Sequence, residues 1–333
     1  MRMLMIGTGP IGGIIGGRLA RAGHDIYFVD VDREHVAAIR ANGLHVDVPD
    51  GAFRVNVRIG FPGELQGSFD TVFLAVRSNY TADALATALP HLAAGGLLVS
   101  LQNGINPPLL AAEVGPDRAV GVAIRMGCRK VAPGRVQTAI RGHLYLGHLH
   151  GRTTPRLESL VALLNPVIPS ETTDNILGVL WSKLTYTCLG YFGSLADASL
   201  KTICEEDSNR RALVDFLGEV VAVGAAGGVR FVPLAEYDPA DFHPARALPA
   251  RLAALDDMAK GFKSYDRKGP LRQIQQGMVT EVDFTLAHVV REGERLGVPT
   301  PLCRKVLAMI HELEAGRRPL TLASYGELST ASG

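Results

Sequence analysis

The chain has 333 residues, 37 of them glycine, and 47% of its residues are hydrophobic. This length suits two domains better than one, and the apolar content excludes a disordered chain. Its 34 basic residues balance 33 acidic ones, and aromatic residues make up only 6%. Because a nucleic-acid surface needs concentrated positive charge or a stacking platform, we expect no nucleic-acid partner. The surplus of glycine needs a local explanation.

The N-terminus and the cysteines bear on the compartment. Met1–Ala20 has an early arginine followed by apolar and small residues, which loosely resembles a signal peptide. Its glycines, however, have the spacing of a nucleotide-binding turn, so we expect a cytoplasmic protein. The four cysteines are scattered, with no C-x-x-C pair and no spacing of a disulfide framework, which favours buried thiols in a reducing compartment. No apolar run reaches about 18 residues, so we expect no membrane partner.

Residues 1–150 alternate short apolar runs with helical stretches. In chain order, strands are predicted at Met3–Ile6, Asp25–Val29, Thr71–Val76 and Leu97–Leu101, and helices at Pro10–Ala22, Arg33–Ala41 and Ala82–Leu92. This alternation is typical of right-handed crossovers and of a doubly wound, mostly parallel sheet. Further strands, expected on the far side of that sheet, are predicted at Val120–Arg125, Arg135–Ala139 and His143–His148.

Later residues carry apolar side chains at three- and four-residue spacing, which predicts helices. These helices are Arg156–Leu164, Ile176–Gly190, Asn209–Ala226, Gln273–Leu296 and Arg304–Ala315. Four prolines within Val232–Pro249 exclude a continuous helix there. The expected architecture is α/β: a Rossmann-type doubly wound parallel sheet in a dinucleotide-binding domain, residues 1–172, followed by an all-helical C-terminal domain, residues 173–333, which binds substrate. A homodimer is compatible with such a helical domain, although the sequence marks no interface.

The strongest motif is a glycine turn, Gly7-Thr8-Gly9-Pro10-Ile11-Gly12, between a predicted strand and a predicted helix. In this context Gly7 permits a tight turn, Gly9 lets the backbone approach a pyrophosphate, and Gly12 lets the helix pack on its strand. The helix N-terminus, which includes Pro10 and Ile11, offers N–H groups to the phosphates. The motif predicts a nicotinamide dinucleotide as cofactor; a tight turn without a ligand is the alternative.

The second predicted strand is followed by Asp30, about 20 residues after the glycine turn. A carboxylate there accepts hydrogen bonds from both ribose hydroxyls of NAD and repels the 2′-phosphate of NADP. Asp32 takes this role if the register differs by two residues. The nearest basic residue, of the kind that NADP enzymes use, is Arg33. We therefore predict NAD rather than NADP.

Polar residues also follow the third and fourth predicted strands. Arg77 follows one, and Asn103 follows the other within Leu101–Ile105. Doubly wound sheets bind ligands at such strand ends. In the helical half, Lys183 and Glu281 lie on separate predicted helices. Facing a nicotinamide, this pair could bind a carbonyl group and supply its proton.

Together these residues resemble the ketopantoate reductase (2-dehydropantoate 2-reductase) family, over roughly residues 2–315. The resemblance rests on the order and spacing of several motifs: the glycine turn, L-Q-N-G-I at 101–105, G-x-V at 134–136, L-W-x-K-L at 180–184, E-x-x-x-V from Glu219, and T-E-V-D at 280–283. It implies a Rossmann domain followed by an all-helical domain, with the active site in the cleft between them. It also implies hydride transfer from the nicotinamide to a 2-oxo acid.

The resemblance also assigns roles to residues. Lys183 would be the general acid that protonates the developing alkoxide, and Glu281 would position the substrate hydroxyl or the lysine. Asn103 would touch both cofactor and substrate. Arg77 is the retained basic residue after the third strand and would bind the cofactor.

The sequence departs from the family at several contacts. Typical members place asparagines four and eight residues after the lysine, where this chain has Thr187 and Tyr191, which we assign to the substrate site. Members also carry a substrate-binding serine about a dozen residues before the glutamate. That place holds Lys268 or Gly269 here, and the nearest serine is Ser264. With the acidic residue after the second strand, these differences favour a family member that acts on a different hydroxy or oxo compound.

The sequence therefore predicts an NAD(P)-dependent dehydrogenase or reductase of a CH–OH group, whose substrate is a small hydroxy or oxo acid or a related alcohol or ketone. A true 2-dehydropantoate 2-reductase of pantothenate biosynthesis and a non-catalytic NAD(H)-binding redox sensor are alternatives. Simpler readings also exist for single residues: a threonine bonded to its own helix at Thr187, core packing at Tyr191, and a helix cap at Glu281. The histidine cluster at 143–150 has no acidic or cysteine ligand near it in sequence, so no metal is predicted.

Overall fold

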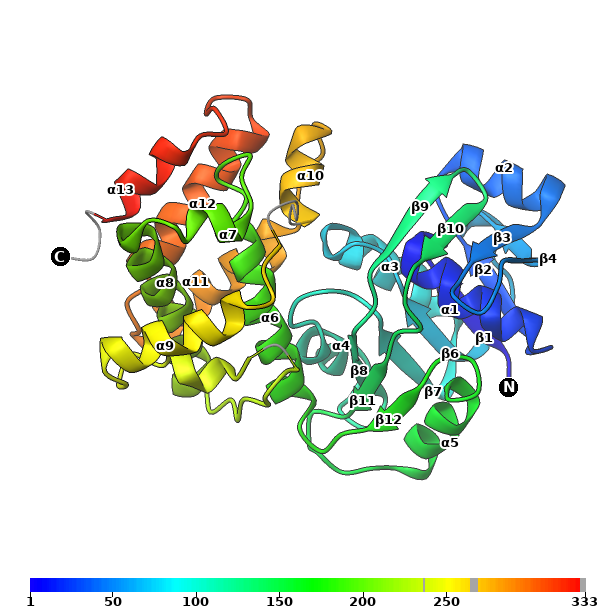
Figure 1. Cartoon of the computed structure of the whole chain (residues 1–333). Coiled ribbons are helices and arrows are strands. Elements are labelled where there is room, and N and C mark those ends of the chain that lie inside the picture. The colour runs from blue at the N-terminus through cyan, green and yellow to red at the C-terminus, as the bar shows by residue number, and fades with distance from the viewer. Residues whose placement is uncertain (236, 264–268, 330–333) are drawn as a thin grey trace. The chain divides into compact units, whose positions relative to one another are not determined.

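The computed structural model describes residues 1–235, 237–263 and 269–329 (Figure 1). The chain separates into two compact units, Met1–Ile176 and Leu177–Gly333. The first is built around β-sheet and the second from helices, so the predicted α/β fold with a helical C-terminal region is confirmed. The sequence-predicted positions Ser264 and Lys268 lie outside the described residues.

An eight-stranded sheet forms the centre of the first unit, in the order β12-β11-β8-β7-β6-β1-β2-β5. Its strands are β1 (Met3–Ile6), β2 (Ile26–Val29), β5 (Arg58–Gly60), β6 (Phe69–Leu74), β7 (Leu92–Ser100), β8 (Ala119–Ile124), β11 (Leu144–Gly147) and β12 (Ser170–Thr172). Neighbours pair in parallel except β8 and β11, which pair antiparallel. Because β1, β2, β6 and β7 are parallel, their carboxyl ends meet at one edge, where Ile6 lies beside Val29 and Leu74.

Both faces of this sheet are covered, because successive residues of a strand point to opposite faces. Met3 and Met5 of β1 pack in one core with α1 (Pro10–Arg21) and α5 (Pro155–Leu164). Leu4 and Ile6 pack in a second core with α3 (Thr81–Ala88) and α4 (Pro107–Val114). A strand that is buried on both faces is apolar throughout, which is the pattern that marked β1 in the sequence.

A second sheet of four strands has the order β4-β3-β10-β9. Its strands are β3 (Leu44–Asp47), β4 (Phe53–Val55), β9 (Cys128–Ala132) and β10 (Arg135–Thr138). The prediction that residues 135–139 belong to the main sheet is therefore wrong. β10 pairs with β3 and β9, and its buried Val136 faces Gly13 of α1. Alternating side chains indicate a strand but do not reveal its partner. The β9–β10 hairpin lies beside α2 (Arg33–Asn42), as Figure 1 shows.

The second unit is helical. Its helices are α6 (Ile176–Phe192), α7 (Leu200–Ile203), α8 (Asp207–Ala226), α9 (Leu248–Ala259), α10 (Gly269–Gln275), α11 (Leu286–Leu296), α12 (Pro301–Glu314) and α13 (Gly326–Ser329). The predicted single helix over residues 273–296 is wrong. Gly277 adopts φ +68° and the Met278 N–H donates to the Gln273 carbonyl, which is the Schellman ending of a helix. Glu281 consequently lies in the break between α10 and α11.

Glu219, from the E-x-x-x-V motif, joins α8 to α12. Its carboxylate oxygens accept hydrogen bonds from the N–H groups of Leu302 and Cys303, at 2.9 and 2.8 Å. These N–H groups belong to the first turn of α12, where a helix leaves donors unpaired and carries the positive end of its dipole. Glu219 therefore stabilises the second unit by capping a helix that is distant in sequence.

Burial raises the pKa of Glu219 above its ordinary value. The folded protein then binds more protons at this site than the unfolded chain, so the stability that Glu219 contributes falls as pH rises past that ordinary value. Urea denaturation measures the free energy of unfolding of the wild type and of Glu219→Gln. We expect the wild-type value minus the variant value to be larger at about pH 4 than at about pH 7. A difference that grows with pH would contradict this prediction.

Candidate active site

The glycine turn connects β1 to α1 with no room for side chains at its two ends. Gly7 adopts φ +92°, and a Cβ there would lie 2.9 Å from the backbone of Ala75. A Cβ at Gly12 would lie 2.0 Å from the Gly7 carbonyl oxygen. At Gly9, by contrast, a Cβ would meet no atom within 4 Å. The turn is therefore packed tightly against the protein on one side and open at Gly9.

The N-terminus of α1 lies at this opening. Gly9 is the N-cap and Pro10 is the first helical residue. No described side chain caps this end, and the first turn, which includes Ile11, holds no acidic residue. Free N–H groups and the positive end of the helix dipole are thus presented beside Gly9. A pyrophosphate matches such a place in charge and in hydrogen-bond acceptors.

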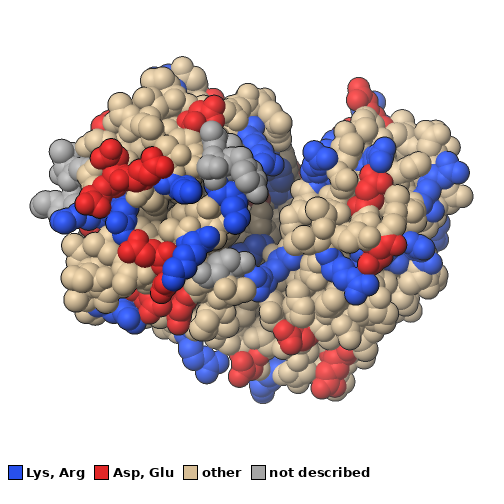
Figure 2. Space-filling model, in the orientation of Figure 1, with Lys and Arg blue, Asp and Glu red and all other residues tan. Residues whose placement is uncertain are grey.

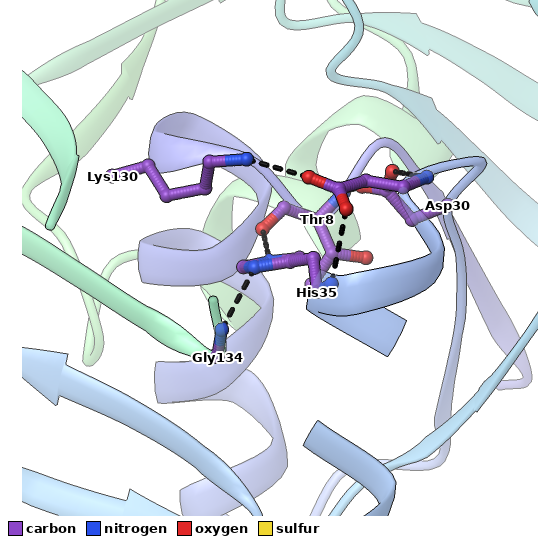
Figure 3. A network of polar contacts seen from close by, with 6 residues as sticks. Thr8, Asp30, His35, Lys130 and Gly134 are labelled. Carbon is purple, nitrogen blue, oxygen red and sulfur yellow. Dashed lines mark hydrogen bonds and ion pairs between the residues drawn. The ribbon is translucent and has the colours of Figure 1, made fainter. Parts of the chain in front are cut away.

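Asp30 follows β2 and reaches back to the glycine turn, as Figure 3 shows. One carboxylate oxygen accepts the Thr8 N–H at 2.6 Å, and the other accepts the Asp32 N–H at 3.0 Å. An ionised carboxylate has about four lone-pair positions, so Asp30 keeps acceptors for ribose hydroxyls while it holds the turn. The sequence motif did not reveal this second role, which depends on the pairing of β1 with β2.

His35, in the first turn of α2, belongs to the same network (Figure 3). Its Nε2 lies 2.9 Å from the Thr8 carbonyl oxygen, and its Nδ1 accepts the Gly134 N–H at 2.9 Å. This pairing requires a neutral ring with its proton on Nε2. Asp32 caps α2 by accepting the His35 N–H at 3.0 Å and also binds Lys130 of β9 at 2.6 Å. His35 and Lys130 carry no local sequence signal for this role, because their partners are distant along the chain.

The loops after β6 and β7 meet at the same edge of the sheet. The Ser78 hydroxyl, next to Arg77, donates to the Asn103 carbonyl at 2.7 Å. The Asn106 side chain donates to the same carbonyl at 2.7 Å. The structure thus brings the Arg77 and Asn103 segments together, at the strand ends where the parallel order places the glycine turn and Asp30.

In the second unit, Lys183 is half-buried on α6. Its carbonyl accepts the Thr187 hydroxyl at 3.0 Å, which confirms that Thr187 is bonded to its own helix. The preceding Ser182 is buried; its hydroxyl accepts the Val232 N–H at 3.0 Å, and its carbonyl accepts the Tyr237 hydroxyl at 2.9 Å. The proline-rich segment therefore anchors the turn of α6 that carries Lys183.

Tyr191 lies two turns further along α6 and is only 2% exposed. Its hydroxyl and that of Thr285 share a hydrogen bond at 2.9 Å, and Thr285 also bonds the Glu281 carbonyl at 2.7 Å. Burial raises the pKa of Tyr191, so the phenol stays protonated. This contact links the helix of Lys183 to the segment of Glu281. The assignment of Thr187 and Tyr191 to the substrate site stays a prediction.

Glu281 itself precedes a short 3-10 turn, Val282–Phe284. The Thr280 N–H donates to the Glu314 side chain at 2.7 Å, and the Thr280 hydroxyl accepts the Val282 N–H at 3.2 Å. The T-E-V-D motif is therefore a turn held on both sides of Glu281. Its glutamate is presented from a fixed loop and not, as predicted, from the middle of a helix.

The histidines of the 143–150 cluster bond to separate partners. His148 contacts the Ala119 carbonyl and the Thr154 hydroxyl at 2.9 and 3.0 Å. His143 pairs with Glu171, and His150 pairs with Asp117. Over the described part of the chain, no three or more histidine, cysteine or acidic residues are arranged to hold a metal ion.

The surface carries charges of both signs. On the face drawn in Figure 2, basic and acidic side chains are interspersed among uncharged residues. Ion pairs such as Arg135–Asp47 join residues of opposite sign. None of the described helices is long and apolar enough to cross a membrane.

These features define a class of protein. Dinucleotide-binding enzymes typically have a mostly parallel sheet covered by helices, a glycine turn that opens a helix, and an acidic residue after the second strand. Residues 3–151 match the family described as Ketopantoate reductase PanE/ApbA, and residues 175–314 match Ketopantoate reductase PanE/ApbA C terminal. The chain belongs to the ketopantoate reductase family, and the resemblance seen in its sequence is confirmed.

Relatives match nearly the whole chain. The 2-dehydropantoate 2-reductase of Pyrococcus abyssi is 26% identical over 318 residues, which cover 95% of this chain and 98% of the relative. That of Halobacterium salinarum is 26% identical over 314 residues, with 93% and 98% covered.

Solved structures show the same fold. The PanE/ApbA family ketopantoate reductase from Ralstonia eutropha has a TM-score of 0.81 at 26% identity, covering 95% of this chain and 99% of its own. D-mandelate dehydrogenase in a ternary structure with NADH and anilino(oxo)acetate has a TM-score of 0.80 at 18% identity, with 95% and 99% covered. At that identity the second likeness concerns the fold alone.

Two glycine substitutions separate packing from ligand binding in the turn. A methyl group at Gly9 meets no protein atom within 4 Å, so Gly9→Ala should keep the wild-type Tm. It should weaken NADH binding about tenfold or more, because the methyl group occupies the space of the phosphates. Gly12→Ala should instead lower the Tm by several degrees, because its methyl group would lie 2.0 Å from the Gly7 oxygen. Scanning calorimetry measures the Tm, and titration calorimetry measures the affinity for NADH. Unaltered NADH affinity in Gly9→Ala would contradict the assignment of the turn to the phosphates.

Proposed function

We propose that this protein is an NAD-dependent dehydrogenase or reductase that transfers hydride between the nicotinamide and a small 2-hydroxy or 2-oxo acid. Membership of the ketopantoate reductase family supports oxidoreduction of a CH–OH group. The observation that carries the proposal is the Asp30 carboxylate, bonded to the Thr8 N–H at 2.6 Å. It puts a negative charge beside the turn that fits the phosphates.

The dinucleotide would be bound by residues 1–172. The cofactor-binding residues in this proposal are Gly7, Gly9, Pro10, Ile11, Gly12, Asp30, Arg77 and Asn103. Asp30 accepts the ribose hydroxyls of NAD with the lone pairs that Thr8 and Asp32 leave. A 2′-phosphate would be repelled there, and two like charges about 4 Å apart cost on the order of 1–4 kcal/mol near a protein surface. NAD is therefore the proposed cofactor.

The substrate would be bound by residues 173–333. When bound, the nicotinamide supplies or accepts the hydride. The Lys183 ammonium donates a hydrogen bond to the carbonyl oxygen and releases a proton to it as the carbon is reduced; in oxidation the neutral amine takes that proton back. The Glu281 carboxylate orients either the substrate hydroxyl or the lysine. Thr187 and Tyr191 complete the proposed substrate side.

A second candidate substrate is 2-dehydropantoate itself. Relatives that carry its name match 93–95% of this chain at 23–26% identity. Thr187 and Tyr191 stand where typical members have asparagines. An asparagine amide offers a donor nitrogen and a separate acceptor oxygen, whereas each of these side chains offers a single hydroxyl oxygen. We therefore place another 2-oxo acid first.

Lys183→Ala tests the catalytic assignment. Loss of a general acid should lower kcat by about 10²–10⁴-fold for the best substrate in a panel of 2-oxo acids that includes 2-dehydropantoate. NADH affinity, measured by calorimetry, should stay near the wild-type value. Lys201→Ala, which removes an exposed lysine from α7, is the matched control and should leave both quantities unchanged. Turnover that survives in Lys183→Ala would show that another group transfers the proton.

Cofactor choice is tested with the wild-type enzyme. We expect kcat/KM for NADH to exceed that for NADPH by about tenfold or more, because Asp30 repels the 2′-phosphate. Steady-state rates with each cofactor at saturating substrate measure this ratio. A preference for NADPH would show that Asp30 does not act on the ribose.

A further inference from the structure

An ammonium group lies next to the proposed ribose site. Lys130 of β9 places its Nζ 2.6 Å from the Asp32 carboxylate, and the two side chains are 41% and 37% exposed. Asp32 stands two residues after Asp30, and its N–H donates to the Asp30 carboxylate at 3.0 Å. Figure 3 shows Lys130 pointing toward this segment. Asp32 therefore connects Lys130 to Asp30, the residue assigned to the ribose hydroxyls.

The fold, and not chance surface contact, brings Lys130 to this place. Lys130 belongs to the β9–β10 hairpin, whose turn contains Gly134. The Gly134 N–H donates to His35 Nδ1, and His35 Nε2 bonds the Thr8 carbonyl inside the glycine turn. The hairpin is thus tied to the glycine turn through a buried histidine. This tie fixes the backbone that carries Lys130 relative to Asp30.

The ammonium group of Lys130 is paired with the Asp32 carboxylate. The hydrogen bond from Lys130 and the N–H of His35 hold the pKa of Asp32 below its usual range, so the carboxylate is ionised at neutral pH. The neighbouring charged residues on the same segment are Asp30, Arg33 and Glu34, and Arg33 and Glu34 are exposed. A phosphate monoester approaching the ribose would meet two carboxylates, together with a lysine already paired to one of them.

We propose that Asp32 and Lys130 form a second determinant of cofactor specificity. Asp32 holds the ammonium of Lys130 in an ion pair and so keeps it from the 2′-phosphate of NADP. Without the Asp32 charge, Lys130 becomes a ligand for that phosphate, which lysine binds as a point charge. This inference rests on the proposed function, since it takes Asp30 as the ribose acceptor.

The test compares dissociation constants for NADPH and NADH, measured by calorimetry, so it needs no substrate. Asp32→Asn removes the charge but keeps a side-chain oxygen to cap α2. We expect the ratio of NADPH affinity to NADH affinity to rise about tenfold. Adding Lys130→Met to this variant should return the ratio to near the wild-type value. Lys130→Met alone should leave NADH affinity unchanged.

Asp47→Asn is the matched control. Asp47 of β3 pairs with Arg135 of β10 at 2.7 Å, so this variant removes the same charge from an ion pair within the small sheet that also carries Lys130. It should leave the affinity ratio unaltered. An equal rise in this control would show a general charge effect and overturn the assignment.

The remaining outcomes are also decisive. A rise in Asp32→Asn that persists after Lys130→Met would show that Lys130 is not the ligand, and no rise would show that Asp32 does not restrain it. Either result overturns the inference. The proposed function is unaffected by these results as long as the wild type binds NADH. If the wild type binds neither cofactor, the proposed function fails together with the inference.

Discussion

Helix α1 can begin beside β1 only because residue 12 has no side chain. A Cβ at Gly12 would lie 2.0 Å from the Gly7 carbonyl oxygen, and a Cβ at Gly7 would lie 2.9 Å from the backbone of Ala75. This close approach brings the helix N-terminus to the sheet edge, where Asp30 accepts the Thr8 N–H. The groups proposed for the phosphates and for the ribose are therefore joined by a direct hydrogen bond. The glycine surplus in the composition has, at these positions, a steric cause.

The second unit positions its groups by hydrogen bonds and not by close backbone approach. Ser182 fastens the turn of α6 that carries Lys183 to the proline-rich segment. Tyr191 joins the same helix to the loop of Glu281 through Thr285. The residue that replaces a family asparagine thus has a structural partner within the protein. Hydrogen bonds through Tyr191 and Thr285 therefore connect the helix of Lys183 to the loop of Glu281.

Sequence patterns predicted what is set locally. The strands β1, β2, β6 and β7 were found because each contains a run of buried apolar residues, and the glycine turn was found because its sterics act within six residues. The placement of β10 was wrong, since strand pairing is decided by distant segments. The helix over residues 273–296 was wrong because Gly277 ends α10 in a conformation that the apolar periodicity does not show. His35 and Lys130 were missed for a related reason: each acts across the chain.

The central claim, that this family member moves hydride between a nicotinamide and an oxo acid, is tested most directly by isotope transfer. NADH that is deuterated at both positions of the reactive nicotinamide carbon is incubated with the enzyme and the best 2-oxo acid, and the product is analysed by mass spectrometry. The hydroxy acid should carry one deuterium on the former carbonyl carbon, and none should form without enzyme. A product that lacks deuterium, or a cofactor that no 2-oxo acid oxidises, would contradict the claim.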